Sequence, residues 1–259
     1  MKWDPAKYVQ FGDYRDRPYF DLTARVHADS PRHVVDLGCG PGNLTATLAE
    51  RWPGALVMGL DSSAEMLAQS AVHTGQFPNL SFGRADITDW MPTEKTDVVV
   101  TNAALQWVPG HRDLLARWLA ALRPGAWFAL QVPGNFNSPS HTLMRGLAES
   151  GAWGGRLAGV LRHDDVVGEP DDYLNIMLDA GCDADAWETT YFQLLPGGNP
   201  VLEWVRGAGL RPVLAALSAA DARDFEAEYA ARLAKAYPAG PHGTVFPFRR
   251  IFAVARKRE

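Results

Sequence analysis

The stretch Asp36-Leu37-Gly38-Cys39-Gly40-Pro41-Gly42 (DLGCGPG) decides the fold of this 259-residue chain. It ends a short apolar run, residues 33–37, that is typical of a buried parallel strand. It precedes residues 43–52, whose apolar side chains recur at helical spacing. Glycines between a strand and a helix let a ligand approach the backbone, and they leave helix N–H groups pointing at it. The stretch therefore predicts a strand–loop–helix unit that binds a ligand at its loop.

The glycine spacing and the acid before the loop indicate which ligand. The glycines follow GxGxG, and Asn43 stands where the GxGxxG of a dinucleotide site has its third glycine. Asp36, at the end of the strand, would repel a pyrophosphate but attract an ammonium group. S-adenosylmethionine carries an ammonium, a carboxylate and a sulfonium and no phosphate. We therefore expect it to be the cofactor.

Two further acids follow the next two predicted strands. Asp61 stands about 20 residues after the loop, where an acid binds both hydroxyls of a ribose. Asp86 follows the third strand, where its carboxylate and the N–H of Ile87 can read an adenine edge. One such aspartate alone is often a cap or turn residue, but three at successive strand ends mark the ligand-binding edge of an α/β sheet. The expected cofactor-binding residues are Asp36, Gly38, Gly40, Asp61, Ser62, Asp86, Ile87, Asn102, Gln106 and Trp107.

Strands and helices alternate over the first half of the chain. Strands are expected at residues 33–37, 55–60, 80–84, 97–102 and 126–132, and helices at 43–52, 62–72 and 113–122. Ser62 and Glu65 are expected to form the capping box of the second helix. The second half is mostly helical, with one strand near 187–194 and a last strand at 249–256.

This order predicts an α/β fold: a doubly wound, seven-stranded, mostly parallel Rossmann-like sheet, with a mostly helical cap inserted before the last strands. The expected regions are an N-terminal lid segment at 1–30, a cofactor-binding core at 31–135, a substrate cap at 136–250 and the last core strand at 251–259.

Composition excludes several other classes of protein. The formal net charge is −5, so we expect no nucleic-acid partner, which would need a basic face. No apolar window is long enough for a membrane span or a signal peptide. The two cysteines are far apart, and neither an HxxxH nor a CxxC motif is present, so we expect no metal. These features favour a cytoplasmic enzyme, and we expect a monomer.

Five motifs resemble those of class I S-adenosylmethionine-dependent methyltransferases: DLGCGPG, LDSS, RADITDW, NAALQWV and LRPGAWFALQ. The whole length further resembles one family among them, the trans-aconitate 2-methyltransferases. That resemblance is carried by WDPAKYVQF, QVPGN, HTLMRG, DAGC, WETTYF, GAGLRP and FPFRRIFAVARK. It implies a carboxyl O-methyltransferase that esterifies one carboxylate of a small polycarboxylic acid, such as trans-aconitate, and releases S-adenosylhomocysteine.

A carboxylate acceptor is already ionised at pH 7, so no general base and no catalytic side chain are required. The acid needs counter-charge instead, which arginine supplies bidentately. Arg211 is the first candidate, at a helix break beside Trp204, although each arginine taken alone is as often a surface residue. Tyr8 and Phe11 share one face of the expected lid, with Tyr8 and Arg211 as positioning groups. The expected substrate-binding residues are Tyr8, Phe11, Arg211, Arg249 and Arg250; Arg15 and Arg17 are weaker candidates.

Three other functions fit parts of the sequence. The same fold could methylate a quinone ring carbon or the carboxyl group of a fatty-acid precursor. A nicotinamide-dependent oxidoreductase is disfavoured by Asp36 and the missing third glycine. A non-catalytic S-adenosylmethionine-binding module is disfavoured by the expected cap, since a sensor needs no closed acceptor pocket.

Overall fold

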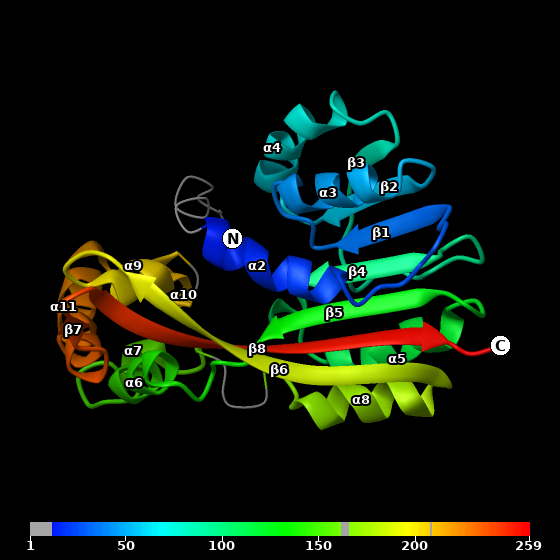
Figure 1. Cartoon of the computed structure of the whole chain (residues 1–259). Coiled ribbons are helices and arrows are strands. Elements are labelled where there is room, and N and C mark those ends of the chain that lie inside the picture. The colour runs from blue at the N-terminus through cyan, green and yellow to red at the C-terminus, as the bar shows by residue number, and fades with distance from the viewer. Residues whose placement is uncertain (1–11, 162–165, 208) are drawn as a thin grey trace. The chain divides into compact units, whose positions relative to one another are not determined.

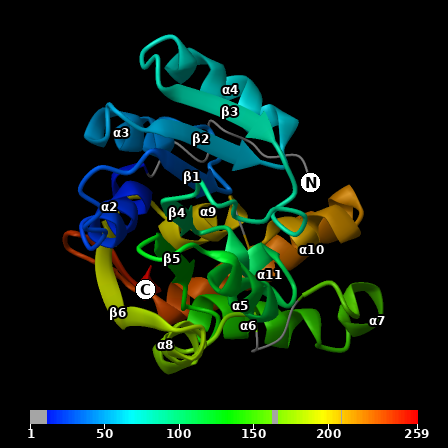
Figure 2. The ribbon, with the colours of Figure 1, turned by 90° about the vertical axis from the view of Figure 1, so that its right-hand side faces the viewer.

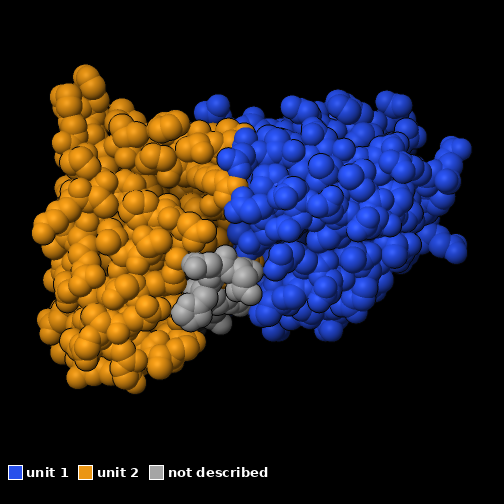
Figure 3. Space-filling view, turned by 90° about the horizontal axis from the view of Figure 1, so that it is seen from below, with its two compact units in different colours: residues 1–132, 167–188, 251–259 blue, residues 133–166, 189–250 orange. Residues whose placement is uncertain are grey.

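The computed structural model describes residues 12–161, 166–207 and 209–259, and no side chains at residues 12, 13 and 15. The expected lid residues Tyr8 and Phe11, and the Arg15 side chain, lie outside what is described. The chain divides into two compact units (Figure 3). Unit 1 takes the described residues up to Val132, with Val167–Glu188 and Ile251–Glu259; unit 2 takes Pro133–Val166 and Thr189–Arg250. Residues 167–188, expected within the cap, therefore group with unit 1.

A mostly parallel sheet forms the centre of unit 1. Its strand order is β3-β2-β1-β4-β5-β8-β6, and β7 also pairs with β8. The first five strands pair in parallel, and Figure 1 shows β8 running against its neighbours. The order reverses between β1 and β4, which is the position where such sheets bind ligands. The strands are β1 (His33–Leu37), β2 (Leu56–Asp61), β3 (Leu80–Arg84), β4 (Val98–Asn102), β5 (Trp127–Pro133), β6 (Cys182–Leu195), β7 (Ala239–Gly240) and β8 (Gly243–Lys257). The predicted Rossmann-like fold class is confirmed.

Helices cover both faces of this sheet. On one face, Trp118 of α5 and Met177 of α8 pack against strand residues such as Phe128 in one buried cluster. Figures 1 and 2 show α2 on the opposite face. The helices of unit 1 are α2 (Gly12–Thr23), α3 (Asn43–Arg51), α4 (Ala64–Thr74), the 3₁₀ turn η1 (Leu105–Trp107), α5 (His111–Ala121) and α8 (Pro170–Asp179).

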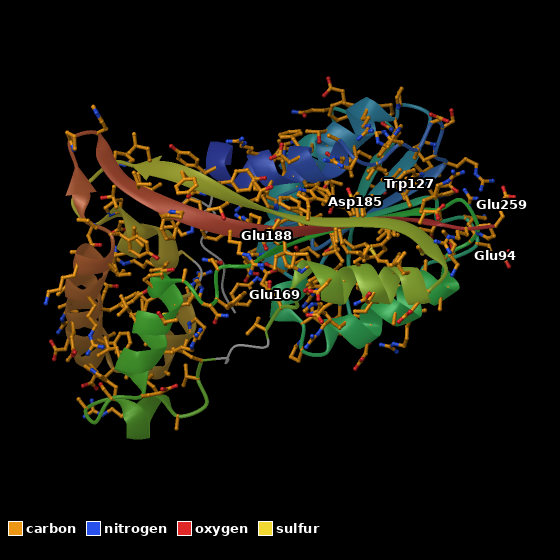
Figure 4. The ribbon with its side chains drawn as sticks, turned by 60° about the horizontal axis from the view of Figure 1, so that its bottom comes forward. Glu94, Trp127, Glu169, Asp185, Glu188 and Glu259 are labelled. Atoms are coloured by element: carbon orange, nitrogen blue, oxygen red, sulfur yellow. The ribbon has the colours of Figure 1, made fainter. Side chains whose placement is uncertain are left out.

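Arg25, just after α2, attaches this end of the helix to strand β6. It pairs with Asp185 at 3.1 Å, and its guanidinium lies 4.9 Å from the ring of Trp187. Trp187 in turn stacks on Phe252 of β8, with ring centroids 4.9 Å apart. Figure 4 labels Asp185 on β6, together with Glu188, the last residue of that strand within unit 1.

Unit 2 has its own core of aromatic side chains. Helices α6 (Pro139–Ala148) and α11 (Ala219–Ala236) are joined through the hydroxyl of Tyr229, which donates to the carbonyl of Ser140. Tyr237 accepts a hydrogen bond from the backbone N of Ser140 at 3.0 Å. The other helices of unit 2 are α7 (Gly154–Leu157), α9 (Pro200–Arg206) and α10 (Arg211–Ala216).

Three local expectations differ from the structure. The N-cap of α4 is Ser63, not Ser62: the Ser63 hydroxyl accepts from the backbone N of Met66 at 3.2 Å. Strand β6 begins at Cys182, earlier than the expected residue 187. The sequence did not indicate this early part, because the side chains of an edge strand alternate with polar residues and form no apolar run. Strand β8 begins at Gly243 and contains Pro247, a residue that normally argues against a strand.

Candidate active site

The acids of the predicted site lie at or just after the ends of neighbouring parallel strands. Asp36 lies in β1, Asp61 ends β2 and Asn102 ends β4, while Asp86 follows β3. The parallel register places Leu37 beside Leu60 and Asp36 beside Val100. Because the carboxyl ends of parallel strands meet at one edge, the structure brings these side chains to the same edge of unit 1.

Three glycines of the loop have positive φ, and two of them also permit close packing. The φ values of Gly38, Gly40 and Gly42 are 75°, 56° and 83°. A Cβ added to Gly38 would lie 2.4 Å from the Cβ of Ala104, and one added to Gly42 would lie 2.6 Å from Cζ of Phe82. Around a Cβ added to Gly40, nothing described lies within 4 Å. The backbone at Gly40 is therefore open to a ligand.

Asp61 is fixed by two backbone hydrogen bonds. Its Oδ2 accepts from the N of Gly40 at 2.9 Å, and its Oδ1 accepts from the N of Ser63 at 2.8 Å. Each carboxylate oxygen can accept more than one hydrogen bond, so both retain capacity for the hydroxyls of a ribose. Ser62, beside it, is exposed, and its carbonyl accepts from Nε of Arg84 at 3.2 Å. Asp61 therefore both positions the glycine loop and faces the place where a ligand would approach.

Asp36 is a buried carboxyl, 3% exposed, whose Oδ2 accepts from the hydroxyl of Thr45 at 2.6 Å. Burial raises the pKa of Asp36 to about 7; the Thr45 hydrogen bond lowers it, and the nearby charge of Asp61 raises it. Among the residues that the structure describes, no cation pairs with Asp36. An ammonium group of a ligand would supply the missing positive charge.

Asp86 is exposed and forms a turn. Its Oδ1 accepts from the backbone N and the hydroxyl of Thr88, at 2.8 and 2.7 Å, and these bonds lower its pKa. The side chain of Ile87 is half-buried, with its Cδ1 3.7 Å from the Cβ position of Gly38. Asp86 thus has the structural role of a turn residue, and its reading of an adenine edge stays a prediction.

The turn after β4 holds strained backbone that the sequence did not indicate. Ala103 has a φ of 54°, in the left-handed region that alanine rarely adopts. Its N donates to the carbonyl of Gln131 at 2.9 Å, and its carbonyl accepts from Nε2 of Gln106 at 2.5 Å. The buried Oδ1 of Asn102 has no hydrogen-bond partner among the described residues. Asn102, Gln106 and the half-buried Trp107 of η1 thus lie at the same edge as the three acids.

Ala103 and Thr45 are residues of this edge that sequence reasoning missed. No sequence signal marks Ala103, because its φ is set by contacts made after β4. Thr45 follows the glycine loop within α3, where a buried hydroxyl facing back to the strand is a weak signal.

The acid Asp97 lies at the opposite end of β4. Burial raises its pKa, but hydrogen bonds from Arg32 and Arg123 outweigh burial and bring it to about 2, so Asp97 has a structural role.

The expected substrate arginines lie in unit 2. Arg211 begins α10 and is half-buried. Arg249 donates through Nη1 to the carbonyl of Gly134 at 3.4 Å. Arg250 is 5% exposed, and its guanidinium lies 4.4 Å from the ring of Phe248. The exposed Arg17, in α2 of unit 1, lies 3.8 Å from Asp21.

Two structural features are absent from the described residues. No group of three or more His, Cys, Asp or Glu side chains is placed to hold a metal ion. Within the described ranges, no helix has the length and apolar character needed to cross a membrane.

Comparisons with known proteins identify methyltransferases that are similar to this chain. Residues 34–125 match a family model described as a methyltransferase domain. The chain is 55% identical to a protein of Streptomyces avermitilis named trans-aconitate 2-methyltransferase, covering 98% of this chain and 97% of that one. It is 56% identical to a protein of the same name from Rhodococcus jostii, covering 98% and 99%.

Solved structures share the fold at low sequence identity. The YcgJ protein of Bacillus subtilis has a TM-score of 0.58 at 12% identity, over 92% of this chain and 97% of that one. A phosphoethanolamine N-methyltransferase 2 of Haemonchus contortus in complex with S-adenosyl-L-methionine has a TM-score of 0.56 at 17% identity, over 94% of this chain and 53% of that one.

Proposed function

The chain belongs to the trans-aconitate 2-methyltransferase family, and we propose that it esterifies one carboxylate of trans-aconitate or a closely similar polycarboxylic acid. It is an S-adenosylmethionine-dependent methyltransferase with the Rossmann-like class I fold. The predicted cofactor and enzyme class are therefore confirmed.

The carboxyl edge of unit 1 fits the cofactor. Asp36 is a buried acid with no cation partner among the described residues, and it suits the ammonium group. Gly40 leaves open backbone beside Asp61, whose two held oxygens suit the ribose hydroxyls. The backbone N of Ile87 suits an adenine edge. The open backbone at Gly40, next to an acid that is already positioned, is the single observation that supports this assignment most strongly.

The reaction makes few chemical demands on the protein. When bound, S-adenosylmethionine supplies an electrophilic methyl group on a sulfonium. An acceptor carboxylate is ionised at neutral pH, so no side chain has to remove a proton. The chain's own residues then bind the cofactor and the acid, orient them and exclude water.

We assign the acceptor's spare carboxylates to the arginines of unit 2. Arg211 is the first candidate. Of the neighbouring Arg249 and Arg250, Arg250 is the better candidate, because it is buried against Phe248. A guanidinium binds a carboxylate through two parallel hydrogen bonds, so it fixes orientation as well as charge. Tyr8 and Phe11 remain proposed contacts of the acid.

The location and assembly state are also proposals. Cys39 and Cys182 are both free, buried thiols, which fits the reducing conditions of the cytoplasm. The acidic net charge supports the absence of a nucleic-acid partner. We propose that the enzyme acts as a monomer on a small molecule.

A labelled-methyl transfer assay tests the proposed function. Purified protein is incubated with methyl-labelled S-adenosylmethionine and a panel of di- and tricarboxylic acids, with a quinone and a fatty-acid precursor as further acceptors. We expect a monomethyl ester of trans-aconitate, identified by mass spectrometry, and its hydrolysis by mild alkali should release the label as methanol. Label found only on a carbon, or only on the fatty-acid precursor, would replace this proposal with one of the other methyltransferase functions.

A further inference from the structure

Gln193 of strand β6 is a buried side-chain amide with no hydrogen-bond partner in the part of the chain that the structure describes. Its side chain is 1% exposed. Neither Nε2 nor Oε1 has a hydrogen-bond partner among the described residues. Buried side-chain amides are normally bonded at both atoms, because water is lost from both on folding. Both amide atoms of Gln193 therefore retain the capacity to hydrogen-bond a ligand.

The burial pattern of the strands shows where this amide lies. In β6, Tyr191, Gln193 and Leu195 are buried, whereas the alternate residues Phe192 and Leu194 are 73% and 42% exposed. Successive side chains of a strand point to opposite faces. Gln193 therefore points to the covered face of the strand.

The buried face of the neighbouring strand β8 carries aromatic rings and a cation. Phe246, Phe248 and Arg250 are buried there, alternating with exposed Val245. Trp204 of α9 packs on this face, with its ring centroid 5.9 Å from that of Phe246 and 5.5 Å from that of Phe248. The face therefore combines an apolar wall with the guanidinium of Arg250.

Gln193 and this wall are close along the two strands. A Cβ added to Gly243 of β8 would lie 2.9 Å from the carbonyl of Leu195 in β6. The two strands run in opposite directions (Figure 1), so Gln193, two residues before Leu195, lies level with the part of β8 just after Gly243. Thr244 and Phe246 are the buried residues there.

We propose that Gln193 is a specificity-determining residue of the acceptor site, where its Nε2 donates a hydrogen bond to a spare carboxylate of the polycarboxylic acid. This rests on the proposed function. A neutral amide suits such a place because it donates to a carboxylate without adding a charge to an aromatic wall. Since neither amide atom has a partner in the described residues, the acid sets which way the amide turns. Oε1 then accepts from a water that enters with the acid.

Steady-state kinetics of Gln193→Leu and Gln193→Glu test this assignment, with Thr190→Ala on the exposed face of β6 as a matched control. For Gln193→Leu we expect a KM for trans-aconitate raised about 10- to 100-fold, with little change in kcat or in the KM for S-adenosylmethionine. The Tm should be equal or higher, because two buried polar atoms without a partner in the described residues are removed. For Gln193→Glu the KM should rise further with pH, as the new carboxylate ionises and repels the acid. The control should match the wild type.

A raised Tm with an unchanged KM for trans-aconitate would overturn the assignment, since it would show an unpaired core residue without a ligand. If Gln193→Leu does not fold, the KM and Tm of Gln193→Met are compared with those of the wild type instead. The wild-type protein is measured in the same experiment. Failure of the wild type to esterify any acid overturns the proposed function, whereas normal wild-type activity with an unaffected variant overturns only the role of Gln193.

Discussion

The backbone N of Gly40 donates to Oδ2 of Asp61 over 2.9 Å, which joins the glycine loop after β1 to the end of β2. The other oxygen of Asp61 accepts from Ser63 at 2.8 Å, next to the start of α4. One carboxylate thus holds two backbone segments in place before any ligand arrives. Such preorganisation reduces the ordering that binding would otherwise require.

Replacing Asp61 should therefore weaken cofactor binding. For Asp61→Ala we expect a loss of about 1–3 kcal/mol in S-adenosylhomocysteine affinity, the scale of lost hydrogen bonds to a charged group. Part of the loss arises because the Gly40 and Ser63 amides lose their acceptor. Isothermal titration calorimetry measures the affinity, with the exposed Asp89→Ala as control. An unchanged affinity would show that Asp61 only supports the turn into α4.

Cofactor affinity should depend on pH through Asp36. In the ligand-free protein the pKa of Asp36 is raised to about 7, first by burial, so below pH 7 this carboxyl is mostly protonated and neutral. An ammonium ligand prefers the ionised carboxylate. S-adenosylhomocysteine affinity should therefore rise with pH, by at most about tenfold per pH unit below pH 7, and level off above it. Calorimetry from pH 5.5 to 8.5 measures this curve.

The variant Thr45→Val separates Asp36 from other groups. The Thr45 hydroxyl lowers the pKa of Asp36, so its removal should raise that pKa and move the affinity curve to higher pH. Thr45→Ser, which keeps the hydroxyl, serves as control. The ligand-free protein should also lose stability as pH rises from about 4 to 7, because a carboxyl with a raised folded-state pKa stabilises the fold while protonated. If the pH dependence of S-adenosylhomocysteine affinity is the same in Thr45→Val as in the wild type, Asp36 is not the group that causes it.

The maximal rate should behave differently from the affinity. At saturating cofactor and acid, kcat should be flat between pH 6 and 8, because an ionised carboxylate needs no base. Stopped assays across this range, at cofactor concentrations far above KM at each pH, measure it. A steep rise that follows one side chain would point to a hydroxyl or carbon acceptor, and so to another methyltransferase function.

Gly38, which packs against Ala104, and Ala103 both have positive φ and should respond in opposite ways to substitution. Gly38→Ala places a Cβ 2.4 Å from that of Ala104, at a φ of 75°, and should cost about 2 kcal/mol or more in unfolding free energy. Ala103→Gly removes strain at a φ of 54° and should keep or raise stability, by up to about 1 kcal/mol. Urea unfolding measures both. Destabilisation by Ala103→Gly would show that the alanine methyl packs more favourably than its backbone strain costs.

Local sequence patterns were sufficient to predict the edge of unit 1 where the glycine loop and the acids come together. The strand–glycine loop–helix order and the acids after three strands depend on residues close in the chain, and the parallel sheet brings them together. The φ of Ala103 was not predictable, because it depends on a hydrogen bond to Gln131 on another strand. The start of β6 was also missed, since polar residues of an edge strand lack an apolar run. The amide of Gln193, which has no partner among the described residues, depends on what covers the strand, and no local pattern reports that.

The acceptor side is tested by Arg211. Removing a desolvated, charge-assisted contact costs about 2–5 kcal/mol, so Arg211→Ala should lower kcat/KM for trans-aconitate by roughly 30- to several-thousand-fold. Arg211→Lys should recover little, because a point charge does not reproduce the planar, two-bonded fork of a guanidinium. S-adenosylhomocysteine affinity should be nearly unchanged in both. Arg223→Ala, an exposed arginine of α11, is the matched control. A lower Tm with intact kinetics in Arg211→Ala would make Arg211 a structural residue at the start of α10, and the binding of the acid would then have to rest on Arg249, Arg250 and Gln193.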